Sequence, residues 1–116
     1  MTQSHSEDYL KLMNQLRGLS KIYNDAYGYK LGTNKATKEL YAGLFIKYKT
    51  SQEKKSVKDI EASITLDKDW VMQKLKDDDA DKKHLKAKTD YNNMLTEISL
   101  LQSELKRELQ LMGKER

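Results

Sequence analysis

The architecture of this chain depends most on residues 67–112, which read DKDWVMQKLKDDDADKKHLKAKTDYNNMLTEISLLQSELKRELQLM. Steps of three and four residues place one set of side chains on a single helical face along this whole stretch. That face consists of Trp70, Gln73, Asp77, Ala80, His84, Ala87, Tyr91, Met94, Leu95, Ile98, Leu101, Leu105, Leu109 and Met112. The chain contains no proline that would interrupt such a helix. The spacing therefore predicts one long closing helix over about 68–112, with Asp67 as its N-cap.

A first helix is predicted over about 6–27, because the capping-box pair Ser4 and Glu7 precedes an apolar stripe at helical spacing. The stripe consists of Tyr9, Leu12, Met13, Leu16, Leu19, Tyr23, Ala26 and Tyr27. Gly28 and Gly32 bracket a predicted bend, since glycine readily adopts the left-handed conformation that ends a helix.

A second helix is predicted over about 33–49, followed by a connector over about 50–67. The apolar stripe of this helix consists of Ala36, Leu40, Tyr41, Leu44 and Tyr48. The connector fits two forms. Val57, Ile60 and Ile64 continue a helical spacing, whereas the β-branched run 63–66 favours an extended segment.

These elements predict a single all-α domain over residues 1–116, an elongated helical hairpin or bundle with a long C-terminal helix. Neither shorter helix matches the closing helix in length, so its leucine-rich end is expected to pack partly against another copy of the chain. The expected oligomerisation residues are Tyr91, Leu95, Ile98, Leu101, Leu105, Leu109 and Met112.

Composition narrows the class of protein. Charged residues make up 34% of the chain and the net charge is +4. The positive charge belongs to residues 1–60, where eleven Lys and Arg face six Asp and Glu, against eleven and twelve in residues 61–116. Without cysteine there are no disulfides, no thiol catalysis and few routes to structural zinc. No apolar run is long enough for a membrane span, and residues 1–8 lack the pattern of a signal peptide. We expect a cytoplasmic protein, in the host cytoplasm if it is phage-encoded, without a cofactor.

The strongest functional candidate is the segment 29–58, where eight lysines outnumber two acidic residues and alternate with aromatic rings. Ammonium groups neutralise phosphates and rings offer faces for unpaired bases, which is the chemistry that single-stranded nucleic acid requires. The candidate nucleic-acid-binding residues are Tyr29, Lys30, Lys35, Lys38, Phe45, Lys47, Lys49, Lys54, Lys55 and Lys58. The alternative is structural, with Tyr41, Leu44 and Tyr48 as core and the lysines as a solvated face.

No residue pattern indicates catalysis or a metal site. The acidic run from Asp77 to Asp81 lacks the glycine and the closing glutamate of a calcium loop, which favours a solvated helical face or an acidic knob that faces a neighbouring subunit. His5 and His84 have no partner at ligand spacing. We therefore expect a protein that is not an enzyme and holds no metal.

The run from Leu40 to Lys49, the lysine-rich Gln52 to Lys58 and the long closing helix after Asp67 together resemble small bacteriophage recombination mediators of the UvsY type. The resemblance covers about residues 38–112, and the acidic run departs from it. It implies a helical oligomer that binds single-stranded DNA and helps to load a recombinase onto strands covered by single-strand binding protein. By this resemblance the DNA contacts are Lys47, Lys49, Lys54, Lys55 and Lys58, and the closing helix assembles the ring or dimer.

Two functions fit these features. The first is a non-catalytic single-stranded DNA-binding recombination mediator, with itself, a recombinase or a single-strand binding protein as protein partners. The second is a small helical protein-binding module, a phage-type inhibitor or coiled-coil adaptor that acts through its long helix or its acidic cluster.

Overall fold

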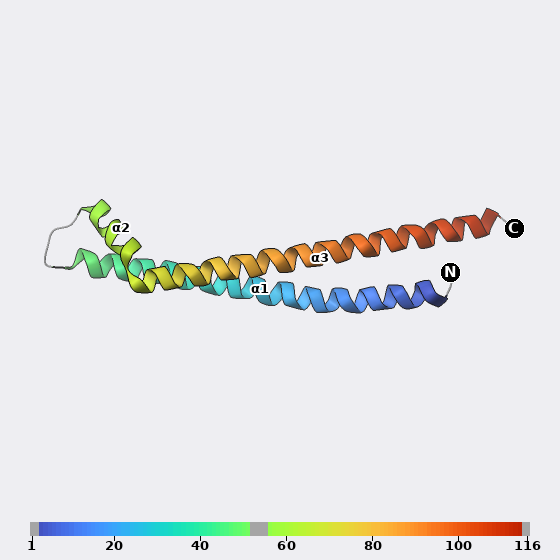
Figure 1. The fold of residues 1–116 in the computed structure, drawn as a ribbon, viewed down its shortest axis with the longest axis horizontal. Coiled ribbons are helices and arrows are strands. Elements are labelled where there is room, and N and C mark those ends of the chain that lie inside the picture. Colours follow the sequence, from blue (N-terminus) through green and yellow to red (C-terminus); the bar gives the residue numbers. More distant parts are fainter. Residues whose placement is uncertain (1–2, 52–55, 115–116) are drawn as a thin grey trace. The chain divides into compact units, whose positions relative to one another are not determined.

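The computed structural model describes residues 3–51 and 56–114 and, among these, the side chains of residues 6–51 and 56–113. The described residues form three helices, α1 (Gln3–Lys49), α2 (Val57–Leu66) and α3 (Lys68–Lys114) (Figure 1). The predicted all-α class and the long closing helix are confirmed, and α3 passes without a break through the acidic run 77–81. Over the described part of the chain, no helix has an apolar stretch that could cross a membrane.

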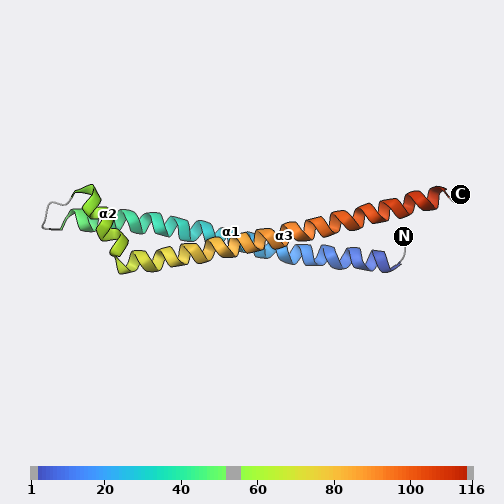
Figure 2. The same ribbon diagram turned by 45° about the horizontal axis from the view of Figure 1, so that its top comes forward.

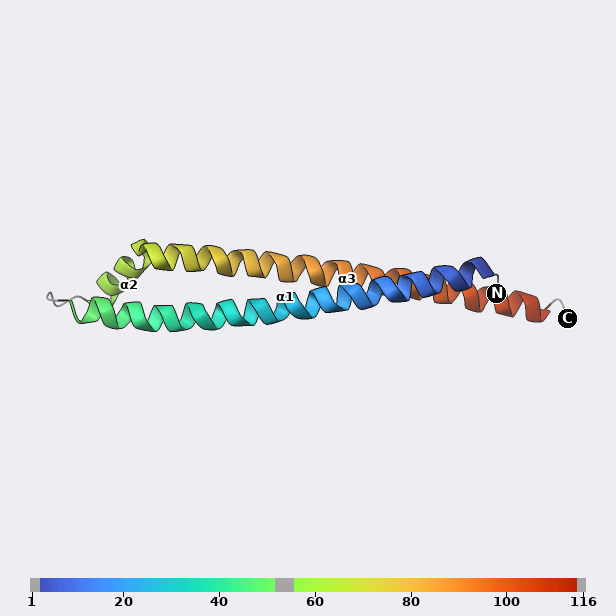
Figure 3. The same ribbon diagram turned by 90° about the horizontal axis from the view of Figure 1, so that it is seen from below.

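The chain divides into two units. The first combines residues 1–25 with 85–116, and the second comprises residues 26–84. Both long helices contribute to both units. In each unit the segments of α1 and α3 lie side by side and run in opposite directions (Figures 1 and 3).

The first unit has an apolar seam. Ile98 is buried, and the rings of Tyr23 and Tyr91 meet edge to face with their centroids 5.5 Å apart. The predicted stripe of α1 is at least half-buried here at Tyr9, Leu12, Met13, Leu16, Leu19 and Tyr23. Edge-to-face rings and interdigitated leucines are the contacts that hold two amphipathic helices together.

The second unit has its core where α2 meets the two long helices. Leu44, Ile60 and Ile64 are buried there, and Leu40, Phe45, Tyr48 and Trp70 pack around them. Figure 2 shows α2 as a short separate helix between the end of α1 and the start of α3. Burial of the two isoleucines stabilises α2, because a helix of 10 residues is marginal on its own.

Polar caps define both ends of α2. At its start, Ser56 and Asp59 form a capping box. After its end, Asp67 accepts hydrogen bonds from the backbone N–H groups of Asp69 and Trp70, so it caps α3 as predicted. The hydroxyl of Tyr48 donates to the other oxygen of Asp67 at 2.6 Å, which ties the end of α1 to the start of α3.

Between this core and the end of the second unit, the seam between α1 and α3 is polar. The Thr37 hydroxyl lies 2.6 Å from Asp77 Oδ2, and Gln73 Nε2 donates to the Thr33 carbonyl and to Thr37 Oγ1. Thr33, Thr37 and Asp77 are all buried. Farther along, Ala80 is fully buried, and such a small residue allows the backbones to approach closely.

Two expectations about the helices need correction, and of the two forms left open for the connector the structure has the helical one. The bend at residues 28–32 is absent, because α1 is continuous from Gln3 to Lys49 and no glycine in the described residues has a positive φ. Glycine permits a left-handed turn but does not impose one. With 47 residues, α1 equals α3 in length, so the idea that the closing helix lacks a partner within the chain is wrong. The connector is largely helical, since α2 occupies Val57–Leu66.

The apolar stripe predicted for residues 33–49 is also partly wrong. Leu44 is buried and Leu40 and Tyr48 are half-buried, but Ala36 and Tyr41 are exposed. The buried positions between Lys30 and Leu40 are instead the two threonines of the polar seam. Hydrophobicity alone therefore misplaced the face of α1 that meets α3. Tyr27, the last residue of the stripe predicted for residues 6–27, is also exposed, because it lies beside the seam and not in it.

Candidate nucleic-acid interface

The lysines of the candidate segment do not form one surface. Lys35, Lys38 and Lys49 are exposed and share the face of α1 that points away from α3, where they alternate with the exposed Leu31 and Ile46. Lys58 is exposed in the first turn of α2. Lys54 and Lys55 lie outside the described residues.

Two other lysines already have neighbours. Lys30 is half-buried in the seam, with its Nζ 3.9 Å from Asp81 Oδ1. The Nζ of Lys47 lies 5.4 Å from the centre of the Tyr48 ring, within the range of a cation–π contact. These two residues contribute positive charge, but they are less available to phosphates than the lysines of the outer face.

The two rings proposed for base stacking differ in their surroundings. Tyr29 is 45% exposed, and Lys83 Nζ lies 5.7 Å from the centre of its ring. Phe45 is half-buried and packs against the core of the second unit. Of these two rings, Tyr29 is therefore the one that combines an exposed face with an adjacent cation.

The hydrogen bond between Tyr48 and Asp67 changes the acidity of both groups. Donation from the Tyr48 hydroxyl, assisted by the backbone N–H groups of Trp70 and Asp69, lowers the pKa of Asp67 below its ordinary value. The same hydrogen bond, together with partial burial and the negative charge of Asp67, raises the pKa of Tyr48. A neutral phenol bonded to a carboxylate is a structural contact here, which agrees with the alternative that assigned Tyr48 to the core.

The acidic run is divided between the seam and the surface. Asp77 is buried, while Asp78, Asp79 and Asp81 are exposed. Lys83 Nζ lies 3.0 Å from Asp79 Oδ2, which raises the pKa of that lysine through the hydrogen bond and the charge of the carboxylate. No group of three or more potential metal ligands occurs among the residues that the structure describes.

The predicted oligomerisation residues of α3 fall into two groups. Ile98 is buried, and Tyr91, Leu101 and Leu105 are half-buried in the first unit, so α1 already covers part of this set. Three residues remain exposed, Leu95, Leu109 and Met112.

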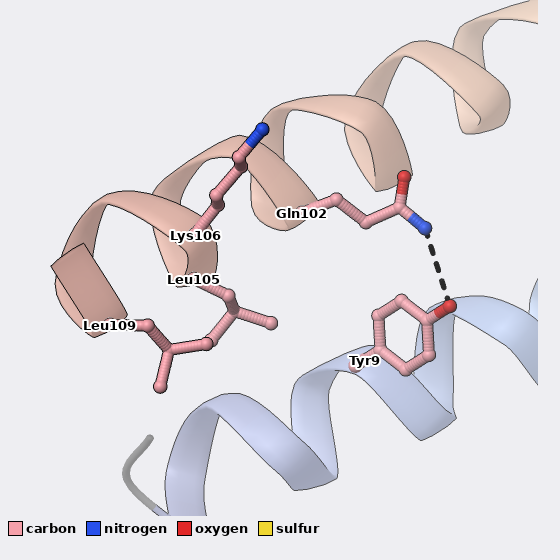
Figure 4. A pocket seen from close by; sticks show the side chains of 5 residues that line it. All are labelled: Tyr9, Gln102, Leu105, Lys106 and Leu109. Atoms are coloured by element: carbon pink, nitrogen blue, oxygen red, sulfur yellow. Dashed lines mark hydrogen bonds between the residues drawn. The ribbon is translucent and has the colours of Figure 1, made fainter.

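One open pocket lies beside the exposed end of α3. Its volume is about 340 Å³, and it is lined by Tyr9, Gln102, Leu105, Lys106 and Leu109. Figure 4 shows Leu105 and Leu109 projecting from α3 near the Tyr9 ring, whose hydroxyl accepts a hydrogen bond from Gln102 at 3.4 Å. Its leucines and its tyrosine ring suit an apolar side chain of another protein better than a charged ligand.

A second pocket lies in the unit 26–84 and involves residues that sequence reasoning missed. It also measures about 340 Å³, and its lining residues are Tyr29, Gly32, Thr33, Ala36, Gln73 and Lys76. We refer to it as the Tyr29 groove. Gln73, Lys76 and the nearby Lys83 belong to α3, and the spacing of seven residues between the two lysines was the available signal that they share one helical face.

Comparisons with protein-family models, with curated proteins and with solved structures find no match to this chain. The fold and the site thus define a class, an all-α protein of paired helices with separate basic, polar and apolar surfaces.

Proposed function

We propose that this protein is a non-catalytic single-stranded DNA-binding accessory protein that acts as a recombination mediator. The observation that carries the proposal is Tyr29, an exposed ring with the Lys83 ammonium group 5.7 Å from its centre. Exposed rings next to cations are the feature by which sequence-tolerant binders hold unpaired bases.

The outer face of α1 supports the same function. Lys35, Lys38 and Lys49 are exposed on it, and none of them forms an ion pair among the described residues. Three lysines on one side of a helix give a positive surface along which a phosphate backbone can lie. Such contacts are individually weak, so tight binding requires several of them at once, as in a homo-oligomer. A recombinase or a single-strand binding protein is the proposed protein partner.

The proposal is tested by titration of the protein into a fluorescent single strand of about 30 bases, with anisotropy followed at two salt concentrations and a duplex of equal length as control. We expect binding that prefers the single strand and weakens steeply with salt. Replacement of Lys35, Lys38 and Lys49 by Gln should weaken binding and reduce the salt slope by about 2, since each lost phosphate contact on a single strand contributes about 0.7.

A matched variant replaces Lys21, Lys88 and Lys106 by Gln, three exposed lysines that lie outside the candidate segment. It removes the same charge and should retain most of the affinity and of the slope. If both triple variants lose affinity equally, binding depends on net charge alone. If the wild-type protein does not bind at low salt, the DNA-binding function is wrong.

The second candidate is a protein-binding module, and the pocket in Figure 4 favours it. Leu109, which lines that pocket, is 56% exposed, and Met112 three residues farther along α3 is 51% exposed. Exposed apolar side chains beside a concave apolar surface are typical of protein interaction sites. This function predicts no affinity for the oligonucleotide at moderate salt, together with loss of partner binding or self-association in Leu109→Lys, measured by analytical ultracentrifugation.

A further inference from the structure

The Tyr29 groove is built from both long helices of the unit 26–84. On the α1 side its surface is formed by Gly32 and Ala36, whose small side chains leave the helix backbone accessible. A Cβ added at Gly32 would meet no atom within 4 Å, so the space above this residue is open. A flat ring can therefore approach the helix closely at this point.

The polar groups of the groove are already oriented. Gln73 Nε2 donates to the Thr33 carbonyl and to Thr37 Oγ1, at 3.3 Å and 3.2 Å. Both acceptors lie on the same side of the amide nitrogen, and neither contact uses the amide oxygen of Gln73, which is therefore an acceptor for a ligand. An amide held by two hydrogen bonds is preorganised for recognition of a polar ring edge.

Positive charge lies at two places next to the ring. Lys76 lines the groove, is exposed and forms no ion pair within the described part of the chain. Lys83 lies against the Tyr29 ring and pairs with Asp79, but both side chains of this pair are more than half exposed. Exposed pairs are weak, so a phosphate can compete with Asp79 for Lys83.

We propose that the Tyr29 groove is the docking site for one unpaired nucleobase, which lies against the Tyr29 ring and the Gly32–Ala36 surface while its phosphates contact Lys76 and Lys83. The volume of about 340 Å³ is at the lower end of the range for small-molecule pockets and suits a single nucleotide. This inference rests on the proposed function and deepens it, because it moves the base-stacking site from the lysine segment alone to a groove shared with α3.

The test uses the full-length protein and a fluorescent oligothymidylate of about 30 bases. Tyr29→Ala should weaken binding about 5- to 150-fold, the range for loss of one base–aromatic stack. The matched control is Tyr27→Ala. Tyr27 is 48% exposed, lies on the same helix about 200° around its axis from Tyr29, and does not line the groove. This control should change affinity less than twofold.

A second variant fills the groove without removal of the ring. Gly32→Leu introduces a good helix former at an open position, so the helix content should remain and the base should lose its site. Gly18→Leu, at another helical glycine with open space, is the control. Lys76→Gln should reduce the salt slope by about 0.7, as for one phosphate contact. Circular dichroism checks that each variant is folded.

The outcomes separate the site from the function. If wild type binds and both Tyr29→Ala and Gly32→Leu bind equally well, the groove is not the site although the protein binds DNA. If wild type itself fails to bind, the proposed function is wrong and this inference falls with it. Loss of binding in both groove variants, with binding retained in both controls, supports the inference.

Discussion

The continuity of α1 through residues 28–32 makes a prediction whose sign distinguishes a helix from a bend. We consider the double variant Gly28→Ala and Gly32→Ala. Both glycines lie inside α1, both have ordinary negative φ, and a Cβ at either position would meet no atom within 4 Å. The new methyl groups therefore introduce no clash and no backbone strain.

The magnitude follows from the conformational entropy of glycine. Each Gly→Ala change inside a helix should stabilise the folded state by about 0.5–1 kcal/mol, so the pair should contribute about 1–2 kcal/mol if the effects add. The two positions are one helical turn apart, but the effect of each substitution comes mainly from the backbone entropy of its own residue in the unfolded chain, so the two effects are summed. For a chain of this size, that gain corresponds to a rise in Tm of roughly 4–10 °C.

Thermal unfolding followed by circular dichroism measures the change, with wild type and variant at the same concentration because self-association would also raise the Tm. Gly18→Ala is the control for an interior helical glycine far from the predicted bend, and it should give about half the gain of the pair. A lower Tm in the double variant with a normal gain in Gly18→Ala would refute the continuous helix, because alanine in a left-handed turn costs about 1–2 kcal/mol.

Three further predictions concern the packing of the unit 26–84. Ile64 is 1% exposed, so Ile64→Ala should lower the free energy of unfolding, measured by urea titration, by about 2–5 kcal/mol. The control is Val57→Ala, at a 59% exposed position of the same helix, which should change this free energy little. Thr37→Val should lower the free energy of unfolding by about 1–3 kcal/mol, because it removes the hydrogen bond to buried Asp77. Thr37→Ser keeps the hydroxyl and should keep most of the stability. Equal losses in the two variants would contradict this role of the hydroxyl. The pKa of Asp67 is lowered in the folded state, so its contribution to stability is present above its ordinary pKa of 3.8 and is lost as the pH falls through the folded value. Since the Tyr48 hydroxyl is the main cause, Tyr48→Phe should be destabilising at neutral pH and should show a smaller further loss on acidification than wild type, as followed by urea unfolding at a series of pH values.

The sequence predicted α3 well because one face carries a consistent signal from Trp70 to Leu105. Even the hydrophilic run 77–81 fits that face, since Asp77 and Ala80 occupy seam positions and the other acids point outward. The start of α2 was also accessible. Ser56 and Asp59 have the three-residue spacing of a capping box, which marks a helix start that was not predicted.

Two features could not be read from hydrophobicity. The seam of the unit 26–84 is formed by threonine, glutamine and aspartate, which ordinarily mark exposed positions, so the true face of α1 was missed. The Tyr29 groove depends on which residues of α3 come opposite residues 29–36. That register is a property of the pair of helices and of the chain between them, and no single helical stripe contains it.

The polar seam offers a physical reason for the register itself. Leucine and isoleucine faces tolerate a slip of one heptad, whereas a buried carboxylate does not, because most alternative neighbours cannot supply a hydrogen bond. A slip that placed Asp77 opposite Leu44 instead of Thr37 would bury its charge against the apolar core. The Tyr48–Asp67 hydrogen bond would be lost at the same time. Both contacts therefore favour the one register in which Lys76 and Lys83 come to the side of Tyr29, so the residues that fix the pairing of α1 and α3 also determine whether the groove exists.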